Sequence, residues 1–343
     1  MTIARQLRGV LAVALSCTLL AQTAHGASEV VVYSSVDDVF SRPIAERFEK
    51  QTGIRVKLVT DTEETKSTGL LNRLIAERAR PQADVFWSGD PVRAAILKLR
   101  GIAAAYRSPA AAGIPPEFSD PEGYWTGFSA RARVILYNTT LVSAKLRPNS
   151  VWDLTHSRFK ERACIANPLF GTTSMHAAAL FQVLGEAKAR AFFAGMSRNG
   201  VRMLSSNGEV RRKVANGDCA LGLTDTDDAQ QAIRERKPVG MVYPDATGMG
   251  TLIVPNAEVL IQHAPHSNEA RVFIDYLLSP EVEGLLAASE AAQIPVRAHV
   301  SAPASVARID QLRTMRVQYA PLAQQLDALS RGFLKEWVAQ AHR

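Results

Sequence analysis

Three carboxylates lie within four residues in the second half of the chain. The segment Asp225-Thr226-Asp227-Asp228 directly follows the apolar run Cys219–Leu223. An acid at a helix start is commonly a cap, and we expect at least one of these three to do only that. Three like charges repel one another unless a cation is near. Their oxygens suit a hard metal cation, and an ammonium group would also satisfy them.

Other polar side chains also follow apolar runs. Further acids in such positions are Asp37, Asp38, Asp61 and Asp90. Hydroxyl groups in such positions are Ser34, Ser35, Ser88, Thr172, Thr173, Ser205 and Ser206. Each hydroxyl alone is explained by helix capping. Their convergence on one place would instead favour a binding site rich in hydrogen-bond donors.

The segment Gly171-Thr172-Thr173-Ser174 begins a predicted helix. Backbone N–H groups and the helix dipole make such a start suitable for an anion. Arg131 and Arg133 precede this region, and we expect one of them, Arg133 in our assignment, to face the same site. His176, near the start of the helix, is the one histidine that we keep as a ligand candidate.

The absence of several known motifs argues against several classes of protein. An EF-hand starting at Asp225 fails because Gln230 replaces its glycine and Arg236 its final glutamate. No nucleophile elbow, P-loop, His-Glu-x-x-His or Cys-x-x-Cys motif occurs. The formal charge of +7 invites a nucleic-acid partner, but the basic residues are spread along the chain. We therefore expect no nucleic-acid binding and no enzymatic site.

The elements that must position these groups alternate between short apolar strands and amphipathic helices. This α/β pattern runs in two series. Two strand-like segments, 128–137 and 251–261, lie between the series and predict two lobes joined by crossing strands. In open α/β sheets, ligands bind beyond the carboxyl ends of the strands. The polar residues above should therefore face one cleft between the lobes.

The N-terminal residues 1–26 have the pattern of a secretory leader. Arg5 and Arg8 precede an apolar run, and Ala24-His25-Gly26 offers a cleavage site. Removing this segment lowers the formal charge from +7 to +5. Export places Cys164 and Cys219 in an oxidising compartment, where a disulfide and two reduced thiols are equally open interpretations.

Several phrases, in this order, resemble the periplasmic solute-binding proteins of ABC importers, specifically their ferric-iron-binding branch. They are Phe48–Ile54, Ala83–Trp87, Arg131–Tyr137, Val151–Leu154 and Phe273–Ser279. The resemblance implies a type II, two-lobed Venus-flytrap fold and a monomer that delivers its ligand to an inner-membrane permease. It also implies boundaries: a leader at 1–26, one lobe from 27–127 with 255–300, a second from 128–254, and C-terminal helices at 301–343.

The resemblance further implies that the ligand is ferric iron, bound with a partner anion. The two adjacent tyrosines of that branch fall on Thr226 and Asp227, its histidine on Asp37, and its glutamate on Gly89, beside Asp90. Asp37 and Asp227 are thus the expected metal ligands, and no resident cofactor is expected. A phosphonate, phosphorylated solute or thiamine-like ligand is the alternative, and a secreted enzyme ranks lower. The ligand-binding residues we expect are Ser34, Ser35, Asp37, Ser88, Asp90, Arg133, Gly171, Thr172, Thr173, Asp225, Thr226 and Asp227.

Overall fold

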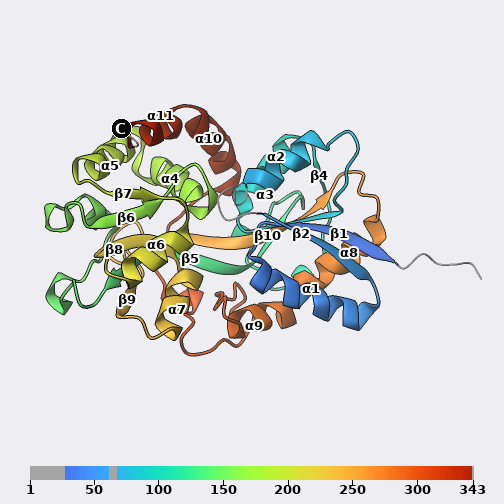
Figure 1. Ribbon diagram of the computed structural model, residues 1–343. Helices are drawn as coiled ribbons and strands as arrows, with labels where there is room; N and C mark the ends of the chain where they lie inside the picture. The colour runs from blue at the N-terminus through green and yellow to red at the C-terminus, as the bar shows by residue number, and fades with distance from the viewer. Residues whose placement is uncertain (1–27, 62–67, 342–343) are drawn as a thin grey trace, which may run out of the picture.

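The computed structural model describes residues 28–61 and 68–341, and the predicted leader at 1–26 lies outside this part. It has two α/β lobes side by side, connected through the strands β5 and β10 (Figure 1). The two-lobed fold with crossing strands predicted from the sequence is therefore confirmed.

The strands are short except for the two that cross between the lobes. Their bounds are β1 Glu29–Ser34, β2 Arg55–Thr60, β3 Val85–Ser88, β4 Ala103–Ala104, β5 Thr126–Asn138, β6 Ala163–Ala166, β7 Arg202–Leu204, β8 Leu221–Asp225, β9 Val239–Val242 and β10 Ile253–Ile261. The main order in the sheet is β2-β1-β3-β10-β5-β8-β6-β7. Strand β4 also pairs with β10, and β9 with β5.

Each lobe has a parallel core that ends at the molecule's centre. In the first lobe β1 pairs in parallel with β2 and β3, and in the second β6 pairs in parallel with β7 and β8. The apolar run Val30–Tyr33 is typical of a strand covered on both faces. The strands β10 and β5 lie between the two parallel cores and pair antiparallel with β3, with each other and with β8. They therefore link the two cores into one sheet.

The crossing strands change direction at a β-bulge. Their pairing shifts register between Pro255 and Asn256, and Ser129 on β5 has a positive φ of 35°. The side chain of Asn256 donates to the Ser129 carbonyl (2.7 Å), and the Glu283 carboxylate accepts from the Ser129 N–H (3.2 Å). These buried contacts satisfy backbone groups that the interrupted ladder leaves unpaired.

Helices cover both faces of the sheet. Their bounds are α1 Asp38–Thr52, α2 Thr68–Ala76, α3 Pro91–Leu99, α4 Gly171–Leu184, α5 Glu186–Arg198, α6 Asn207–Ala215, α7 Thr226–Arg234, α8 Ser267–Leu277, α9 Pro280–Ala288, α10 Tyr319–Arg331 and α11 Phe333–Ala341. The first lobe carries α1–α3, α8 and α9, and the second carries α4–α7 (Figure 1). Helix α1 ends at Gly53, whose φ of 73° suits a glycine.

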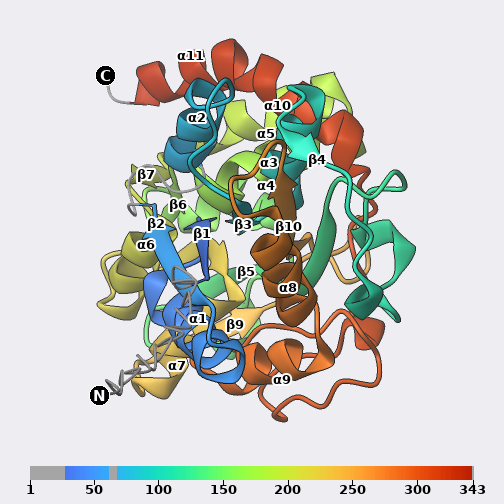
Figure 2. The ribbon, with the colours of Figure 1, turned by 90° about the vertical axis from the view of Figure 1, so that its right-hand side faces the viewer.

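The two C-terminal helices run along the top of the molecule, over α3 and α4 (Figures 1 and 2). Helix α10 packs against both α3 and α4 and so contacts both lobes. The ring of Trp337 on α11 lies 5.3 Å from that of Phe193 on α5. Our helical prediction for 301–343 is right only from Tyr319 onward. Residues 301–318 run without α-helix and contain one 3-10 turn, Ile309–Gln311.

A disulfide joins Cys164 to Cys219 in the second lobe. Cys164 lies on β6 opposite Gly222 of β8, and Cys219 comes two residues before β8 begins. The parallel neighbourhood of these strands brings the two sulfur atoms together, which decides between the two interpretations left open by the sequence.

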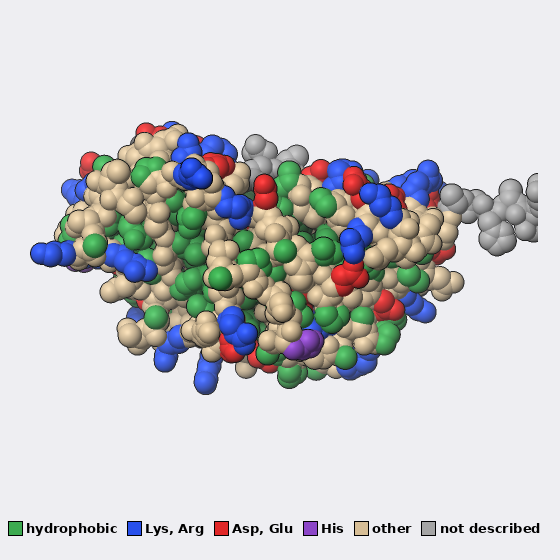
Figure 3. All heavy atoms as spheres, turned by 90° about the horizontal axis from the view of Figure 1, so that it is seen from below, with side chains coloured by type: hydrophobic (Ala, Val, Ile, Leu, Met, Phe, Trp, Pro, Cys, Tyr) green, Lys and Arg blue, Asp and Glu red, His purple; other side chains and the backbone are tan. Residues whose placement is uncertain are grey.

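No helix in the described residues is long and apolar enough to cross a membrane. On the face shown in Figure 3, basic and acidic side chains are scattered rather than gathered into one basic patch.

Candidate functional site

The carboxyl ends of the strands from both lobes converge on one polar pocket, which is partly open to solvent and has a cavity volume of about 40 Å³. The first lobe contributes Ser35 and Asp37, and strand β5 contributes Arg131. The second lobe supplies the remaining lining: Ala166, Asn167, Phe170, Gly171, Thr172, Thr173, Ser205, Ser206, Asn207, Asp225, Asp227 and Asp228. The pocket lies where the topology predicts a ligand site.

Asp225, the last residue of β8, is the centre of the polar network. Its Oδ1 lies 2.7 Å from Nη1 of Arg133, and its Oδ2 lies 3.3 Å from Nη1 of Arg131. Thr172 donates its hydroxyl to Oδ2 (2.6 Å). Burial raises the pKa of Asp225, but Arg133 and Arg131 outweigh it, so the pKa is lowered overall. Asp225 is therefore ionised and held by two guanidinium groups.

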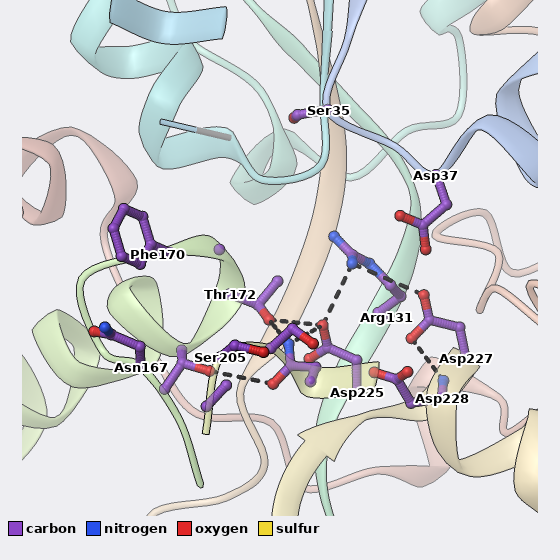
Figure 4. A pocket seen from close by; sticks show the side chains of 15 residues that line it. Ser35, Asp37, Arg131, Asn167, Phe170, Thr172, Ser205, Asp225, Asp227 and Asp228 are labelled. Atoms are coloured by element: carbon purple, nitrogen blue, oxygen red, sulfur yellow. Dashed lines mark hydrogen bonds and ion pairs between the residues drawn. The ribbon is translucent and has the colours of Figure 1, made fainter. Parts of the chain in front are cut away.

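Arg131 and Arg133 point to the same side of β5 because they are two residues apart. Arg133 is fully buried beneath the pocket and donates to Thr172 (2.9 Å) and Thr173 (3.2 Å) as well as to Asp225. Arg131 lies in the lining itself, where Figure 4 shows its guanidinium between Asp225 and Asp227. It also donates to the Gly89 carbonyl of the first lobe.

The first turn of α4 presents its backbone to the pocket. Its N-cap residue is Phe170, whose side chain cannot cap, and Gly171 follows with a φ of 52°. The hydroxyls of Thr172 and Thr173 are engaged below by Arg133. The backbone N–H groups of this turn thus have no side-chain cap, as an anion-binding helix start requires.

Acidic side chains form the other part of the pocket. Asp227 Oδ2 lies 3.9 Å from Arg131, and Figure 4 shows Asp37 facing the same guanidinium from the first lobe. Asp228 accepts from the Thr224 hydroxyl (2.9 Å). Asp225 occupies the N-cap of α7 without making a side-chain cap bond. Our expectation that at least one of the three clustered acids serves only as a cap is thus not met by Asp225, and it stays a prediction for Asp227 and Asp228.

The structure brings together seven of the twelve predicted ligand-binding residues in the pocket lining: Ser35, Asp37, Gly171, Thr172, Thr173, Asp225 and Asp227. Arg133 lies directly beneath them. The other four make local contacts instead. Ser34 accepts from the Val36 N–H (3.2 Å), and Thr226 accepts from the Ala132 N–H (3.2 Å).

Ser88 and Asp90 complete the group of predicted residues that the lining leaves out. Ser88 donates to the Asp90 carbonyl (2.6 Å) within its own turn. Asp90 caps α3 by accepting from the Arg93 N–H (3.0 Å). Both side chains are buried, and they shape the strand-to-helix turn that borders the site.

His176 lies away from the pocket, in a small apolar cavity of the second lobe with Leu180, Phe192 and Met196 among its neighbours. Its side chain is buried and makes no hydrogen bond among the described residues. Burial, and then the charge of Arg133, lowers the pKa of His176 to about 3. It is a neutral core side chain here and does not reach the polar pocket.

Eight lining residues lie outside our predicted set of ligand-binding residues: Arg131, Ala166, Asn167, Phe170, Ser205, Ser206, Asn207 and Asp228. Ser205 and Ser206 were among the hydroxyls that follow apolar runs, and a sequence signal also existed for three others. Arg131 shares a strand face with Arg133, Asp228 belongs to the acidic cluster, and Asn207 follows Ser205-Ser206 at a strand end. Asn207 donates to Thr172 (2.9 Å) and to Asp225 (3.3 Å). Asn167 and Phe170 had no pattern of their own to mark them.

Among the described residues, four carboxylates and two guanidiniums meet at or directly beneath the pocket: Asp37, Asp225, Asp227 and Asp228 with Arg131 and Arg133. Across residues 28–61 and 68–341, no group of three or more His, Cys, Asp or Glu side chains is arranged to hold a metal ion.

Comparison with known proteins gives a consistent picture. A family model described as bacterial extracellular solute-binding protein matches residues 43–314. Iron uptake protein A1 of Synechocystis is 29% identical over 310 residues, which cover 86% of this chain and 83% of that protein. A periplasmic protein of Salmonella paratyphi A named for 2-aminoethylphosphonate binding is 30% identical over 291 residues, covering 78% and 80% of the two chains.

Among solved structures, iron-bound HitA from Pseudomonas aeruginosa superposes with a TM-score of 0.79 at 23% identity. The superposition covers 89% of this chain and 98% of that one. At this identity the likeness establishes the fold, which is the two-lobed arrangement described above.

Proposed function

The chain belongs to the family of bacterial extracellular solute-binding proteins, and on that premise we propose that it is the periplasmic binding component of an ABC importer. In this proposal it works as an exported monomer that binds its cargo between the lobes. It then delivers the cargo unchanged to an inner-membrane permease, so it is not an enzyme. The leader pattern at 1–26 and the polar pocket between the lobes support this role.

We propose ferric iron, bound together with an anion, as the cargo. The acidic lining carries this proposal: carboxylates reach the pocket from both lobes, Asp37 from the first and Asp227 from the second. Carboxylate oxygens are ligands that hard cations prefer. Asp37 from the first lobe and Asp227 from the second would coordinate the iron. The relative named for iron uptake supports the same cargo.

The anion would complete the coordination. The backbone N–H groups at the start of α4 and the guanidinium of Arg131 both favour negative charge at one end of the pocket. An anion held there would place its own oxygens on the metal. This arrangement explains how two aspartates can hold iron in a pocket where the protein offers no three-residue metal cluster within the described chain.

A second candidate cargo is a small zwitterion with a phosphonate or phosphate at one end and an amine at the other. One observation favours it: Arg131 and the α4 start lie beside Asp37 and Asp227. The pocket thus has one subsite that suits an anion and one that suits a cation. The Salmonella paratyphi A relative is named for such a compound. A thiamine-like phosphate ester has the same two kinds of group.

Titration calorimetry on metal-free mature protein tests these cargoes. The ligands are ferric iron as a weak chelate with carbonate or phosphate, then 2-aminoethylphosphonate, a sugar phosphate and thiamine. We expect tight binding of ferric iron that requires the anion. No tyrosine among the described residues lines the pocket, so the complex should lack a phenolate-to-iron absorption band. No response to iron with a clear response to the phosphonate would replace the first cargo by the second.

A further inference from the structure

Arg93 reaches from the first lobe to the second. It lies on α3, and its side chain is almost fully buried, with 2% of the residue exposed. Its Nη2 donates to the hydroxyl of Ser174 (2.7 Å), and its Nη1 donates to the carbonyl of Gly171 (3.3 Å). Both acceptors belong to the first turn of α4, so one side chain ties the two lobes together.

The electrostatic surroundings make this contact specific. A cation at a helix start is unfavourable by itself because the dipole is positive there. Asp90, at 3.3 Å from Nη1, compensates the charge of Arg93 from within the first lobe. Asp90 also caps α3 through the Arg93 N–H, which fixes the origin of the side chain. The first lobe therefore holds the Arg93 guanidinium in place before the lobes meet. In the second lobe this guanidinium donates to two oxygen atoms, the Gly171 carbonyl and the Ser174 hydroxyl.

The contacted turn is the one that forms part of the pocket. Arg133 engages this turn from beneath through Thr172 and Thr173, while Arg93 engages it through Gly171 and Ser174. Arg93 and Ser174 themselves are absent from the pocket lining. Arg93 thus acts on the position of the turn and not on the cargo.

We propose that Arg93 is an interlobe latch, a positioning residue that stabilises the closed arrangement of the lobes through Gly171 and Ser174. In the latched arrangement the α4 start and Asp37 face each other across the pocket. Loss of the latch favours the open arrangement even without cargo. Cargo affinity then falls by the same factor as the closed population, because only the closed arrangement binds from both lobes. This last consequence rests on the proposed function.

The test is a distance measurement between the lobes in cargo-free protein. Spin labels on Glu46→Cys of α1 and Lys188→Cys of α5, both exposed, report the lobe separation. Arg93→Gln should lower the ratio of closed to open molecules at least threefold. Arg93→Lys should give an intermediate value, since one ammonium cannot reproduce the two-pronged contact. Arg55→Gln, which removes an exposed cation that pairs with Glu29 within the first lobe, should leave the ratio unchanged.

Ser174→Ala separates a latch from general damage to α3. It removes one of the two acceptors in the second lobe and leaves the Gly171 carbonyl, so it should shift the ratio in the same direction but by less than Arg93→Gln. The double variant should shift it no further than Arg93→Gln alone, because both changes break one interaction. Full additivity, or an unchanged ratio in folded Arg93→Gln or Ser174→Ala protein, would overturn the proposal. These distances are measured without cargo, so they judge the latch even if the proposed cargo fails to bind.

Discussion

The carboxylate of Asp225 and the guanidinium of Arg133 form a buried ion pair with 2.7 Å between Oδ1 and Nη1. Asp225 ends a strand of the second lobe, and Arg133 lies on the crossing strand β5. Their backbones are direct cross-strand partners. The pair therefore fastens the floor of the pocket to the strand that connects the lobes.

Replacing Asp225 by Asn should destabilise the fold. The change leaves Arg131 and Arg133 close together without their shared carboxylate. Breaking one side of a buried pair costs about 3–5 kcal/mol because an uncompensated charge remains. Urea denaturation should show this loss in the free energy of unfolding. Asp310→Asn, at an exposed pair with Arg308, is the control and should leave the free energy of unfolding almost unchanged.

The ion pair between Asp225 and Arg133 also makes the stability of the folded protein depend on pH. The pKa of Asp225 is lowered in the folded protein, so its contribution is present above its unfolded pKa. The contribution is lost as the pH falls through the folded pKa. Asp225→Asn should therefore destabilise strongly at pH 7 and less in strong acid. An equal loss of unfolding free energy at both pH values would show that the pair stabilises the fold through its geometry and not through its charges.

Because of Glu258, we expect stability to depend on pH in the opposite direction at higher pH. It lies on β10 with 2% of its surface exposed, and burial raises its pKa to about 8. Between its ordinary pKa of 4.5 and this value the folded protein holds a proton that the unfolded chain has lost. Stability should therefore fall as the pH rises through this window, by at most about 1.4 kcal/mol per pH unit.

Glu258→Gln keeps the shape of the protonated side chain and removes its titration. The variant should gain stability relative to the original protein between pH 5.5 and 7.5, by about 2–3 kcal/mol at most. Thermal or urea unfolding at the two pH values measures this difference. Glu290→Gln, at an exposed position, should show no such gain. Parallel pH profiles for Glu258→Gln and the original protein would contradict the assignment.

The disulfide between Cys164 and Cys219 should contribute substantially to stability. It closes a loop with a sequence separation of 55 residues, for which chain entropy gives about 4 kcal/mol. The double change to Ala should lower the free energy of unfolding by about 2–4 kcal/mol. Alkylation of the unfolded, non-reduced mature protein should leave both cysteines unmodified, and labelling of both would show that they are not paired.

The sequence predicted the fold because its signals were periodic and repeated. Apolar runs such as Val30–Tyr33 and the long segments at 128–137 and 251–261 indicate strands whatever their neighbours are. The order of the two series then predicts two lobes. The segment 301–318 has apolar residues at helical spacing, yet it forms no α-helix and only one 3-10 turn. Contact with the rest of the protein, including the bridge between Thr251 and Thr314, overrides that weak local pattern.

The site was predicted less completely because side-chain direction at a strand end depends on the following turn. Ser34 and Ser35 are adjacent, but only Ser35 lines the pocket. Ser34 turns back to bond Val36. Arg93 illustrates a second limit. It occupies an ordinary helical position, and only the packing of the lobes shows that it meets Gly171 and Ser174.

Asp227 gives the most direct test of the acidic side of the pocket. Its carboxylate lies 3.9 Å from Arg131 and lines the pocket opposite Asp37. If it coordinates the cargo, Asp227→Ala should lower the affinity at least tenfold, which corresponds to about 1.4 kcal/mol. Asp218→Ala, at a half-exposed pair with Lys213 in the same lobe, should leave the affinity unchanged.

The double variant Asp37→Ala/Asp227→Ala extends this test across the lobes. For iron, both carboxylates contact one ion, so removing the second ligand should cost less than removing the first, because the bridge between the lobes is already broken. For a zwitterionic cargo the amine has a single positive charge, and the anion subsite at α4 keeps part of the binding. Titration calorimetry with each cargo on the two single variants and the double variant measures these losses of affinity. An unchanged affinity in Asp227→Ala would mean that this acid only supports the start of α7.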